Sequence, residues 1–479
     1  MPEYEIVVGL EVHAQLLTRT KLFCADTTEF GREPNTEVSA VSLGHPGTLP
    51  VLNKEAISLA VKLGLACNCE IVQHNYFARK NYFYPDLPKG YQISQHTTPV
   101  CRNGNVEITT AKETRAVRLN RIHIEEDAGK SIHDDKSEYS NLDYNRAGMP
   151  LLEIVTEPDI RSAEEAAAFV TMLRKLVRHL QVCDGNMERG SMRCDVNISV
   201  RTKGDQRLGT KVEIKNLNSI RYIKKAIEYE TKRLTGLHQK GEAIVQETRG
   251  FDENDLSTYS IRIKEDEDDY RYFPEPDLPP FLITDEMIGS IRSTMPPLQQ
   301  EVKKRLVNEY GLSAYDAEQI ANDSDLSGFF FELAAQTSNY KTAANWVIGP
   351  LRNHLVSNEV SLDEIKISPA SIATMISLVD ERKISYGIAS QKIFTEIVKR
   401  PSMDILRFIE DNELLTETSQ DEIDRMIQAA LDKHSQKITE YKKGKKGLLS
   451  LFVGEVMKLS KGKADARVVT EKIIEKLNA

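Results

Sequence analysis

The sequence predicts an α+β protein, in which a mixed α/β domain with an antiparallel sheet is followed by domains made only of helices. Three observations support this fold class. Residues 192–201 and 211–217 alternate apolar and polar side chains on either side of a turn-like KGDQRLG segment, as an antiparallel strand pair does. Residues 162–182 repeat apolar side chains at helical spacing. Beyond residue 292, almost every periodic segment is helical.

Capping residues mark where the helices begin and end. Ser162 and Glu165 form a capping box that opens the helix SAEEAAAFVTMLRKLVRHLQV. Ser219 predicts the start of a second helix, IRYIKKAIEYETKRL. Nearer the C-terminus, Pro369 fits the first turn of a helix, and Pro401 ends the helix SYGIASQKIFTEIVK.

The domain boundaries follow from breaks in these patterns. The acidic run KEDEDDYRYFPEPDLPP at 264–280 ends in prolines that forbid regular structure, so the first domain should end shortly after it. The last part of the chain is a separate small helical module with lysine-glycine turns. The expected domains are residues 1–292, 293–410 and 411–479.

Composition bounds the class of protein. The 479 residues are 40% hydrophobic and 28% charged, which is typical of a water-soluble chain with sizeable cores. No apolar run is long enough to span a membrane, and MPEYEIVVG does not start like a signal peptide. The six cysteines have no regular framework spacing and are expected to be reduced thiols. We therefore expect a cytoplasmic protein.

The net charge of −9 is unevenly distributed. Residues 435–479 contain eleven Lys/Arg and five Asp/Glu, which leaves −15 for the rest of the chain. A basic tail on an acidic body is typical of a polyanion-binding appendage, although a solvated helical surface would have the same composition. In KKGKKG, turns would expose backbone amides and lysines together to nucleic-acid phosphates. The candidate lysines are Lys442, Lys443, Lys445 and Lys446.

Several predicted strands carry acids among apolar residues. Glu11 and His13 lie two residues apart, so they share one side of the strand EIVVGLEVHAQL. Glu153 alternates with apolar residues in another strand. In 121–127, Ile122, Ile124 and Glu126 share one face, and His123, Glu125 and Asp127 share the other. An ionised carboxylate on an apolar face costs several kcal/mol, roughly, unless a cation compensates it.

We group Glu11, His13, Glu126 and Glu153 as a candidate metal site. Its oxygen-rich composition suits Mg²⁺ better than zinc. His13 alone would more often be a half-buried histidine with a hydrogen-bond partner. The polar face of 192–201 carries Arg193 and Arg201, which suit either solvent or a phosphate or carboxylate ligand.

Common catalytic motifs are missing from the sequence. GNMERGSM at 185–192 lacks the lysine of a phosphate-binding P-loop. The sequence contains no H-E-x-x-H motif, no G-x-S-x-G nucleophile elbow and no serine-rich amidase loop. Any nucleotide site therefore differs from the common ones, and the chain has no recognisable nucleophile for amide hydrolysis.

Several long segments resemble one family when they are taken in order. They are GLEVH (9–13), RKNYFYPDLPKGYQISQ (79–95), IHIEEDAGKS (122–131), NRAGMPLLEIVTEPD (145–159), GSMRCDVNISVR (190–201), EIKNLNSIR (213–221), QETRGFDE (246–253) and DDYRYFPEPDLPP (268–280). Together they resemble the GatB/GatE family, the B subunits of aspartyl/glutamyl-tRNA(Asn/Gln) amidotransferases. The resemblance runs from about residue 4 to the end and includes a tail similar to the YqeY module.

The resemblance implies a carbon–nitrogen ligase of translation. GatB-like proteins use ATP and Mg²⁺ to phosphorylate the side-chain carboxylate of Glu on tRNA(Gln) or Asp on tRNA(Asn), and ammonia then displaces the phosphate. The ammonia comes from glutamine hydrolysed by the GatA subunit and reaches GatB through a polar tunnel, while GatC completes a heterotrimer. The implied fold is a mixed α/β cradle, a helical domain and a tail that recognises the tRNA elbow.

Motif by motif, the resemblance also implies roles for individual residues. Glu11, His13, Glu126 and Glu153 match the family's catalytic metal site, and Lys80, Tyr82 and Lys89 match the end of the ammonia tunnel. Some members have Cys-x-Cys and Cys-x-x-Cys, a plausible zinc site, where this chain has Cys24-x-Asp26 and Ser39-x-x-Ser42. A structural zinc needs four N/S ligands as a rule, so we expect no zinc.

Two other classes of function compete with this interpretation. One is a non-catalytic tRNA-binding adaptor, in which the acids are structural and the tail carries the activity. The other is a free-standing metal-dependent hydrolase that uses the Glu/His set. ATP-dependent phosphorylation of Glu-tRNA in the presence of partner subunits would distinguish the first interpretation from both.

Overall fold

The structure is a computed structural model that describes residues 3–133, 138–263, 270–415, 420–442, 444–460, 464 and 466–478. The chain divides into two compact units, Met1–Pro296 and Pro297–Ala479. This division does not test the three domains expected from the sequence, which stay a prediction. Within the described ranges, no helix has the length and apolar composition needed to cross a lipid bilayer.

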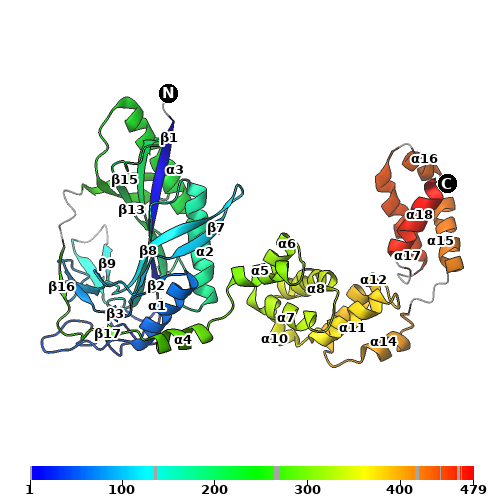
Figure 1. Cartoon of the computed structure of the whole chain (residues 1–479), viewed down its shortest axis with the longest axis horizontal. Helices are drawn as coiled ribbons and strands as arrows, with labels where there is room; N and C mark the ends of the chain where they lie inside the picture. Colours follow the sequence, from blue (N-terminus) through cyan, green and yellow to red (C-terminus); the bar gives the residue numbers. More distant parts are fainter. Residues whose placement is uncertain are drawn as a thin grey trace. The chain divides into compact units, whose positions relative to one another are not determined.

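The first unit is built on a ten-stranded sheet with the order β15-β14-β13-β12-β1-β11-β8-β6-β2, in which β7 pairs with β8 (Figure 1). Its strands are β1 (Tyr4–Gln15), β2 (Glu70–Ile71), β6 (Cys101–Arg102), β7 (Asn105–Thr109), β8 (Thr114–Glu126), β11 (Pro150–Thr156), β12 (Met192–Thr202), β13 (Val212–Leu217), β14 (Glu247–Asp252) and β15 (Ser257–Ile263). The predicted antiparallel pair is confirmed as β12 and β13. The pair β13 and β14 is parallel, because helix α3 (Ile220–Lys240) carries the chain back between them.

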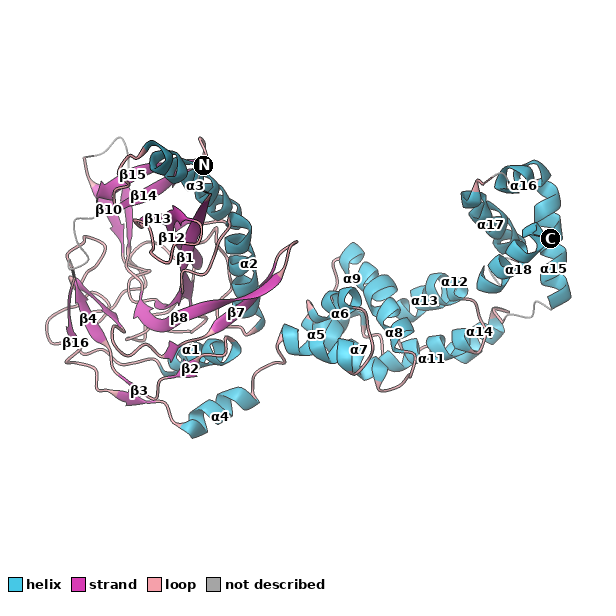
Figure 2. Ribbon diagram, turned by 45° about the horizontal axis from the view of Figure 1, so that its top comes forward, coloured by secondary structure: helices cyan, strands magenta, loops and turns pink. Residues whose placement is uncertain are grey.

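Helices cover the apolar face of this sheet. Helices α2 (Ala163–His179) and α3 contact the central strands β1 and β12, and both views show them on the same side of the sheet (Figures 1 and 2). The predicted N-caps are confirmed, since Glu165 N donates to Ser162 Oγ at 3.1 Å and Tyr222 N donates to Ser219 Oγ at 3.1 Å. The other half of the predicted capping box differs, because Glu165 Oε2 accepts from the backbone N–H of Arg161 at 3.0 Å and not from that of Ser162. Alternate apolar side chains of β1 are buried, namely Ile6, Val8, Leu10, Val12 and Ala14, and Val7 between them is buried as well. The alternate residues of β1, including Glu11 and His13, therefore lie on the opposite face.

Three small sheets and two helices complete the first unit. Strands β4 (Ala78–Asn81), β5 (Tyr91–Ser94) and β16 (Arg271–Pro274) form a sheet in the order β16-β4-β5, while β9 (Lys130–His133) pairs with β10 (Ser140–Asp143) and β3 (His74–Asn75) with β17 (Phe281–Leu282). Helix α1 (Lys54–Ala66) contacts β8 and α4 (Asp285–Ser293). Strands β4, β9 and β16 lie on the side of the large sheet away from α2 and α3 (Figures 1 and 2).

The second unit is helical, as predicted. Its α-helices are α5 (Gln299–Asn308), α6 (Ala314–Ala321), α7 (Ser324–Ala334), α8 (Tyr340–Trp346), α9 (Arg352–Asn358), α10 (Leu362–Ile365), α11 (Pro369–Asp380), α12 (Tyr386–Ile388), α13 (Phe394–Lys399), α14 (Ile405–Asp411), α15 (Gln420–Lys433), α16 (Ser435–Lys442), α17 (Leu449–Leu459) and α18 (Ala466–Asn478). Pro369 opens α11 behind the Ser368 cap, and α13 ends before Pro401. One hydrophobic core of this unit surrounds Phe330 and Trp346, and another surrounds Phe452.

Candidate active site

A row of four charged or titratable side chains crosses the polar face of the large sheet. Directly opposite residues of an antiparallel pair point to the same side of a sheet. Arg193 of β12 is opposite His13 of β1, which is opposite Glu153 of β11, which is opposite His123 of β8. Four strands that are far apart in the sequence thus place these side chains next to one another.

His13 and Glu153 meet Glu125 of β8 within this row. The ring nitrogen Nε2 of His13 is 3.6 Å from Glu153 Oε2 and 3.9 Å from Glu125 Oε1. The three residues, which we call the His13 cluster, offer ligand atoms that all lie within 4.8 Å of one another. The other ring nitrogen of His13, Nδ1, is buried and has no hydrogen-bond partner among the residues that the structure describes. The cluster therefore combines buried carboxylates with an unsatisfied imidazole.

His123 supplies positive charge to the same carboxylates. Its Nε2 is 3.3 Å from Glu153 Oε2 and 3.5 Å from Glu125 Oε2. Burial works to lower the pKa of His123, but Glu153 and Glu125 outweigh it and raise that pKa to about 9. Burial conversely works to raise the pKa of Glu153, and the charges and hydrogen bonds of His123 and His13 hold it well below its usual range. Both carboxylates are thus kept near compensating charge.

A second acidic group lies beside the first. Glu11 of β1 is opposite Asp195 of β12, and with Glu213 of β13 they form a set with ligand atoms within 4.8 Å, which we call the Glu11 cluster. Burial raises the pKa of Glu11, and repulsion from Glu153, Asp195 and Glu213 raises it further. Lys215 Nζ lies 3.0 Å from Glu213 Oε1 and 3.4 Å from Asp195 Oδ2. One lysine thus compensates two of the three acids, and a cation would relieve the remaining repulsion.

The grouping of Glu126 with Glu11, His13 and Glu153 is wrong. Glu126 lies on the other face of β8, where its carboxylate accepts hydrogen bonds from Lys89 Nζ at 2.5 Å and from the backbone N–H of Ile93 at 2.8 Å. Successive side chains of a strand point to opposite faces, so its neighbour Glu125 takes the place on the polar face. The sequence already contained the information to select Glu125, because the alternation of 121–127 puts it on the same face as His123.

The predicted metal site also lacked four residues and treated two separate clusters as one. The structure divides it between the His13 and Glu11 clusters, and the four partners that were not selected are Glu125, His123, Asp195 and Glu213. The alternation of 192–201 and 211–217 puts Asp195 and Glu213 on the polar faces of their strands, but nothing in the local sequence shows that these strands are close to β1. Strand order is a long-range property, so only the assembled sheet brings them together.

The predicted tunnel residues lie on two sides of β8. Lys80 of β4 has its Nζ 4.6 Å from the ring centroid of Tyr270 and 5.7 Å from that of Tyr82. Burial works to lower the pKa of Lys80, and Glu125, Tyr272, Tyr270 and Glu153 together raise it, so its ammonium faces the His13 cluster. Lys89 instead pairs with Glu126 at the wall of a cavity of about 80 Å³. The residues lining that cavity also include Phe23, Cys24, Ser42, His45 and Tyr91.

Hydrogen bonds connect the segment of Asp26 with that of Ser39 and Ser42. Asp26 accepts from the hydroxyl of Ser42 and from the backbone N–H of Ser39 at 3.0 Å. The fully buried ammonium of Lys21 lies 3.9 Å from the same carboxylate and donates to the carbonyl of Glu37 at 2.7 Å. These polar contacts hold the segment, and the expected lack of zinc stays a prediction.

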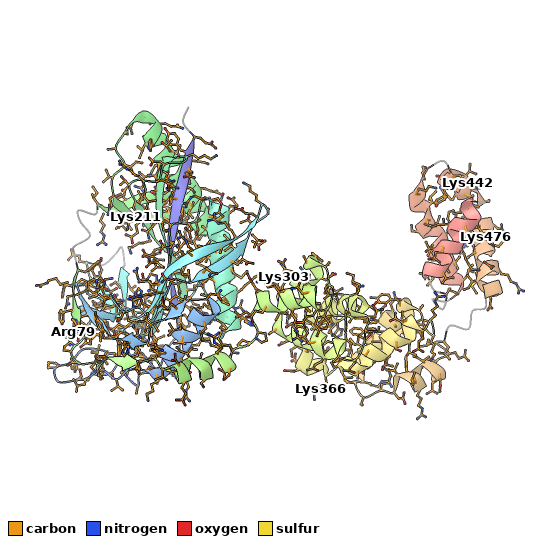
Figure 3. All side chains as sticks on the ribbon, viewed as in Figure 1. Arg79, Lys211, Lys303, Lys366, Lys442 and Lys476 are labelled. Atoms are coloured by element: carbon orange, nitrogen blue, oxygen red, sulfur yellow. The ribbon has the colours of Figure 1, made fainter. Side chains whose placement is uncertain are left out.

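The described candidate tRNA-binding lysines lie at the end of α16 and in the segment before α17. Lys442 is exposed at the end of α16, and Figure 3 labels it there. Lys445 Nζ donates to Glu440 Oε2 at 3.0 Å, and Lys446 Nζ lies 4.2 Å from the ring centroid of Tyr441. Lys443 lies outside the described residues. Three of the four candidates therefore belong to one described turn of the tail.

Two family models match the chain. Residues 6–289 match a family model described as the GatB/GatE catalytic domain, and residues 328–477 match one described as the GatB domain. The chain belongs to the GatB/GatE family. The His13 and Glu11 clusters, as well as the Lys80 and Lys89 segments, all lie within the part that matches the GatB/GatE catalytic domain.

Full-length relatives of the chain include three proteins named as B subunits of aspartyl/glutamyl-tRNA(Asn/Gln) amidotransferase. Those of Thermodesulfovibrio yellowstonii and Persephonella marina are each 46% identical over 476 residues, which is 99% of both chains. That of Caldicellulosiruptor saccharolyticus is 45% identical over 478 residues, again 99% of both chains. The similarity therefore spans the helical unit as well as the sheet.

Proposed function

We propose that this chain is the B subunit of a tRNA-dependent amidotransferase. It uses ATP to phosphorylate the side-chain carboxylate of Glu on tRNA(Gln), of Asp on tRNA(Asn), or of both, and ammonia then displaces the phosphate to form the amide. The observation that carries the proposal is the pair of adjacent acidic clusters on the polar face of the sheet, inside the match to the family's catalytic domain.

The His13 cluster fits Mg²⁺ because it gathers carboxylate oxygens of Glu125 and Glu153 and a ring nitrogen of His13 within 4.8 Å of one another. His13, Glu125 and Glu153 would hold the ion, and the Glu11 cluster offers further carboxylate oxygens beside it. When bound, Mg²⁺ would neutralise charge on the phosphoryl group in transfer. The chain's own carboxylates keep that site anionic, and His123 orients Glu125 and Glu153 through contacts of 3.3 to 3.5 Å.

The second half of the reaction needs ammonia. The sequence has no amidase nucleophile, so a GatA-type subunit would release ammonia from glutamine, and a GatC-type subunit would complete the heterotrimer. The Lys89–Glu126 pair beside its cavity and Lys80 beside Glu125 support a polar route to the sheet.

The tail supplies the remaining contact. The exposed Lys442, together with Lys443, Lys445 and Lys446, would bind tRNA phosphates and hold the charged tRNA while its acceptor end reaches the sheet. The proposal involves no zinc, and it places the reaction in the cytoplasm, where charged tRNA is used.

The deciding experiment uses the complex with its two partner subunits and measures ADP formed from ATP. We expect ADP formation that requires both Mg²⁺ and Glu-tRNA(Gln) or Asp-tRNA(Asn), followed by amide formation when ammonia is supplied. A non-catalytic adaptor would bind tRNA without releasing ADP. A free-standing hydrolase would cleave small esters as the isolated chain. Either of these results would overturn the proposal.

A further inference from the structure

Arg193 ends the row of four side chains on the polar face. It lies on β12 directly opposite His13, so its side chain shares the face of both acidic clusters. Its side chain is 18% exposed, whereas that of Asp127, its partner, is 3% exposed. The Arg193 side chain is therefore mostly enclosed but still in contact with solvent.

Only part of the hydrogen-bonding capacity of Arg193 is used. Nη2 donates to Asp127 Oδ1 at 2.8 Å and Nη1 donates to Asp127 Oδ2 at 3.2 Å, a two-point contact that fixes the plane of the guanidinium. A guanidinium has five N–H donors, and Asp127 is the sole acceptor recorded for Arg193 among the described residues. Three donors thus remain for a ligand.

Asp127 does not depend on Arg193 alone. Gln15 Nε2 donates to it at 3.2 Å, the backbone N–H of Ala128 donates at 3.0 Å, and Arg146 Nε lies 3.4 Å away. A second arginine already compensates the buried carboxylate. Neutralising Asp127 is therefore not a sufficient reason for Arg193 to be there.

The other cations near the two clusters have different hydrogen-bond partners and geometry from Arg193. Lys215 lies against Glu213 and Asp195 in the Glu11 cluster. Arg121 Nη2 lies 3.9 Å from Glu153 Oε1, its Nε lies 3.4 Å from His123 Nδ1, and its side chain is 38% exposed. Arg121 Nη1 donates to Asn120 Oδ1 at 3.3 Å, so no two-point contact with one carboxylate fixes its plane. Lys80 also faces the His13 cluster, but its ammonium is a point charge without a planar fork. Of these described cations, Arg193 is the one that lies opposite His13, is fixed in a plane by a two-point contact and keeps free donors. A planar fork of this kind matches the oxygens of a phosphate.

We propose that Arg193 binds the phosphoryl group that passes from ATP to the substrate carboxylate, and that Asp127 is the residue that positions it. This inference rests on the proposed function. A carboxylate oxygen of the substrate uses its own electron pair to form a bond to the γ-phosphorus. At the same time the bond between the γ-phosphorus and the bridging oxygen breaks, and ADP leaves with the electron pair of that broken bond. Arg193 stays protonated and donates N–H groups to the equatorial oxygens, where negative charge collects during transfer.

The test compares variants of the complex with its partner subunits, using ATP and Glu-tRNA(Gln) as probes and ADP as the product. Arg193→Gln should lower kcat about 10²-fold, as loss of a donor to a developing charge does. Arg193→Lys keeps the charge without the fork and should restore part of the rate. Asp127→Asn should chiefly raise KM for ATP, because the guanidinium is less well fixed. Glutamine hydrolysis should continue in all of them.

The double variant Arg193→Gln/Asp127→Asn separates this role from a structural one. If Arg193 binds phosphate, the double variant stays as slow as Arg193→Gln. Recovery of the wild-type rate would mean that Arg193 only neutralises Asp127, because the double variant contains neither charge, and this would overturn the proposal.

Arg118→Gln is the matched control, since Arg118 also makes a two-point contact with an aspartate, Asp159, at 2.7 and 2.9 Å and belongs to neither acidic cluster. It should change neither kcat nor KM, and a loss equal to that of Arg193→Gln would also refute the assignment. Should Arg193→Gln not fold, Arg193→Lys and Asp127→Asn carry the test, and wild-type values in both would overturn it. If the wild-type complex forms no ADP with either charged tRNA, it is the proposed function that fails, and this inference falls with it.

Discussion

Two adjacent glutamates on opposite faces of β8 should have separable functions. Glu125 faces the His13 cluster with a side chain that is 6% exposed, and Glu126 faces Lys89 with one that is 4% exposed. The substitution Glu→Gln has nearly the same shape at either position, so it removes charge with little change in packing. Glu125→Gln takes away one of the two carboxylates that surround His13.

The expected loss can be estimated from this geometry. Removing a metal ligand from a phosphoryl-transfer site lowers kcat on the order of 10²-fold, which corresponds to about 2.7 kcal/mol in the transition state. Glu125→Gln should therefore lose ADP formation whether glutamine or ammonium chloride supplies the nitrogen. Glu126→Gln should keep ADP formation and ammonium-dependent amidation, and should lose mainly the glutamine-dependent reaction, because Lys89 loses its charged partner at the cavity.

The assay follows ADP and amidated tRNA in the complex with its partner subunits, and thermal unfolding checks that both variants are folded. Wild-type ADP formation in Glu125→Gln would refute the placement of the metal site. Equal loss of ammonium-dependent activity in Glu126→Gln would refute the division between the two faces.

Three further predictions address stability, the tail and the source of ammonia. Without Mg²⁺, the pKa of His123 is raised from 6.5 to about 9 by folding, so His123 should contribute up to about 3 kcal/mol to the free energy of unfolding below pH 6.5 and lose that contribution as the pH rises through about 9. Denaturant unfolding measured against pH should show this fall in stability, and Glu153→Gln should make it smaller. Deleting residues 411–479 should weaken tRNA binding and make its salt dependence shallower, whereas Lys366→Gln, which changes an exposed lysine of the helical unit (Figure 3), should leave both unchanged; an unaltered salt slope in the truncated form would indicate a solvated appendage. The isolated chain should form no amide from glutamine in a partner-free preparation, a result checked by following amidated tRNA with and without added ammonium chloride.

Local signals in the sequence were sufficient for the secondary structure and for much of the chemistry. The Ser162 and Ser219 caps, the Pro369 start and the alternation of 192–201 each depend on residues a few positions apart, and the structure confirms them. Period-two alternation likewise put Glu11 with His13 on the polar face of one strand. These properties are local because capping and side-chain direction are decided by the backbone within one turn or one strand.

Strand order decided the rest. Only the assembled sheet puts β12, β1, β11 and β8 side by side, so that Arg193, His13, Glu153 and His123 form one row. The same pairing brings Asp195 and Glu213 to Glu11, and it selects Glu125 over Glu126 by the face that β8 turns toward Glu153. Pairing between distant strands depends on long-range packing and on which face the helices α2 and α3 cover, and no local pattern of residues encodes either.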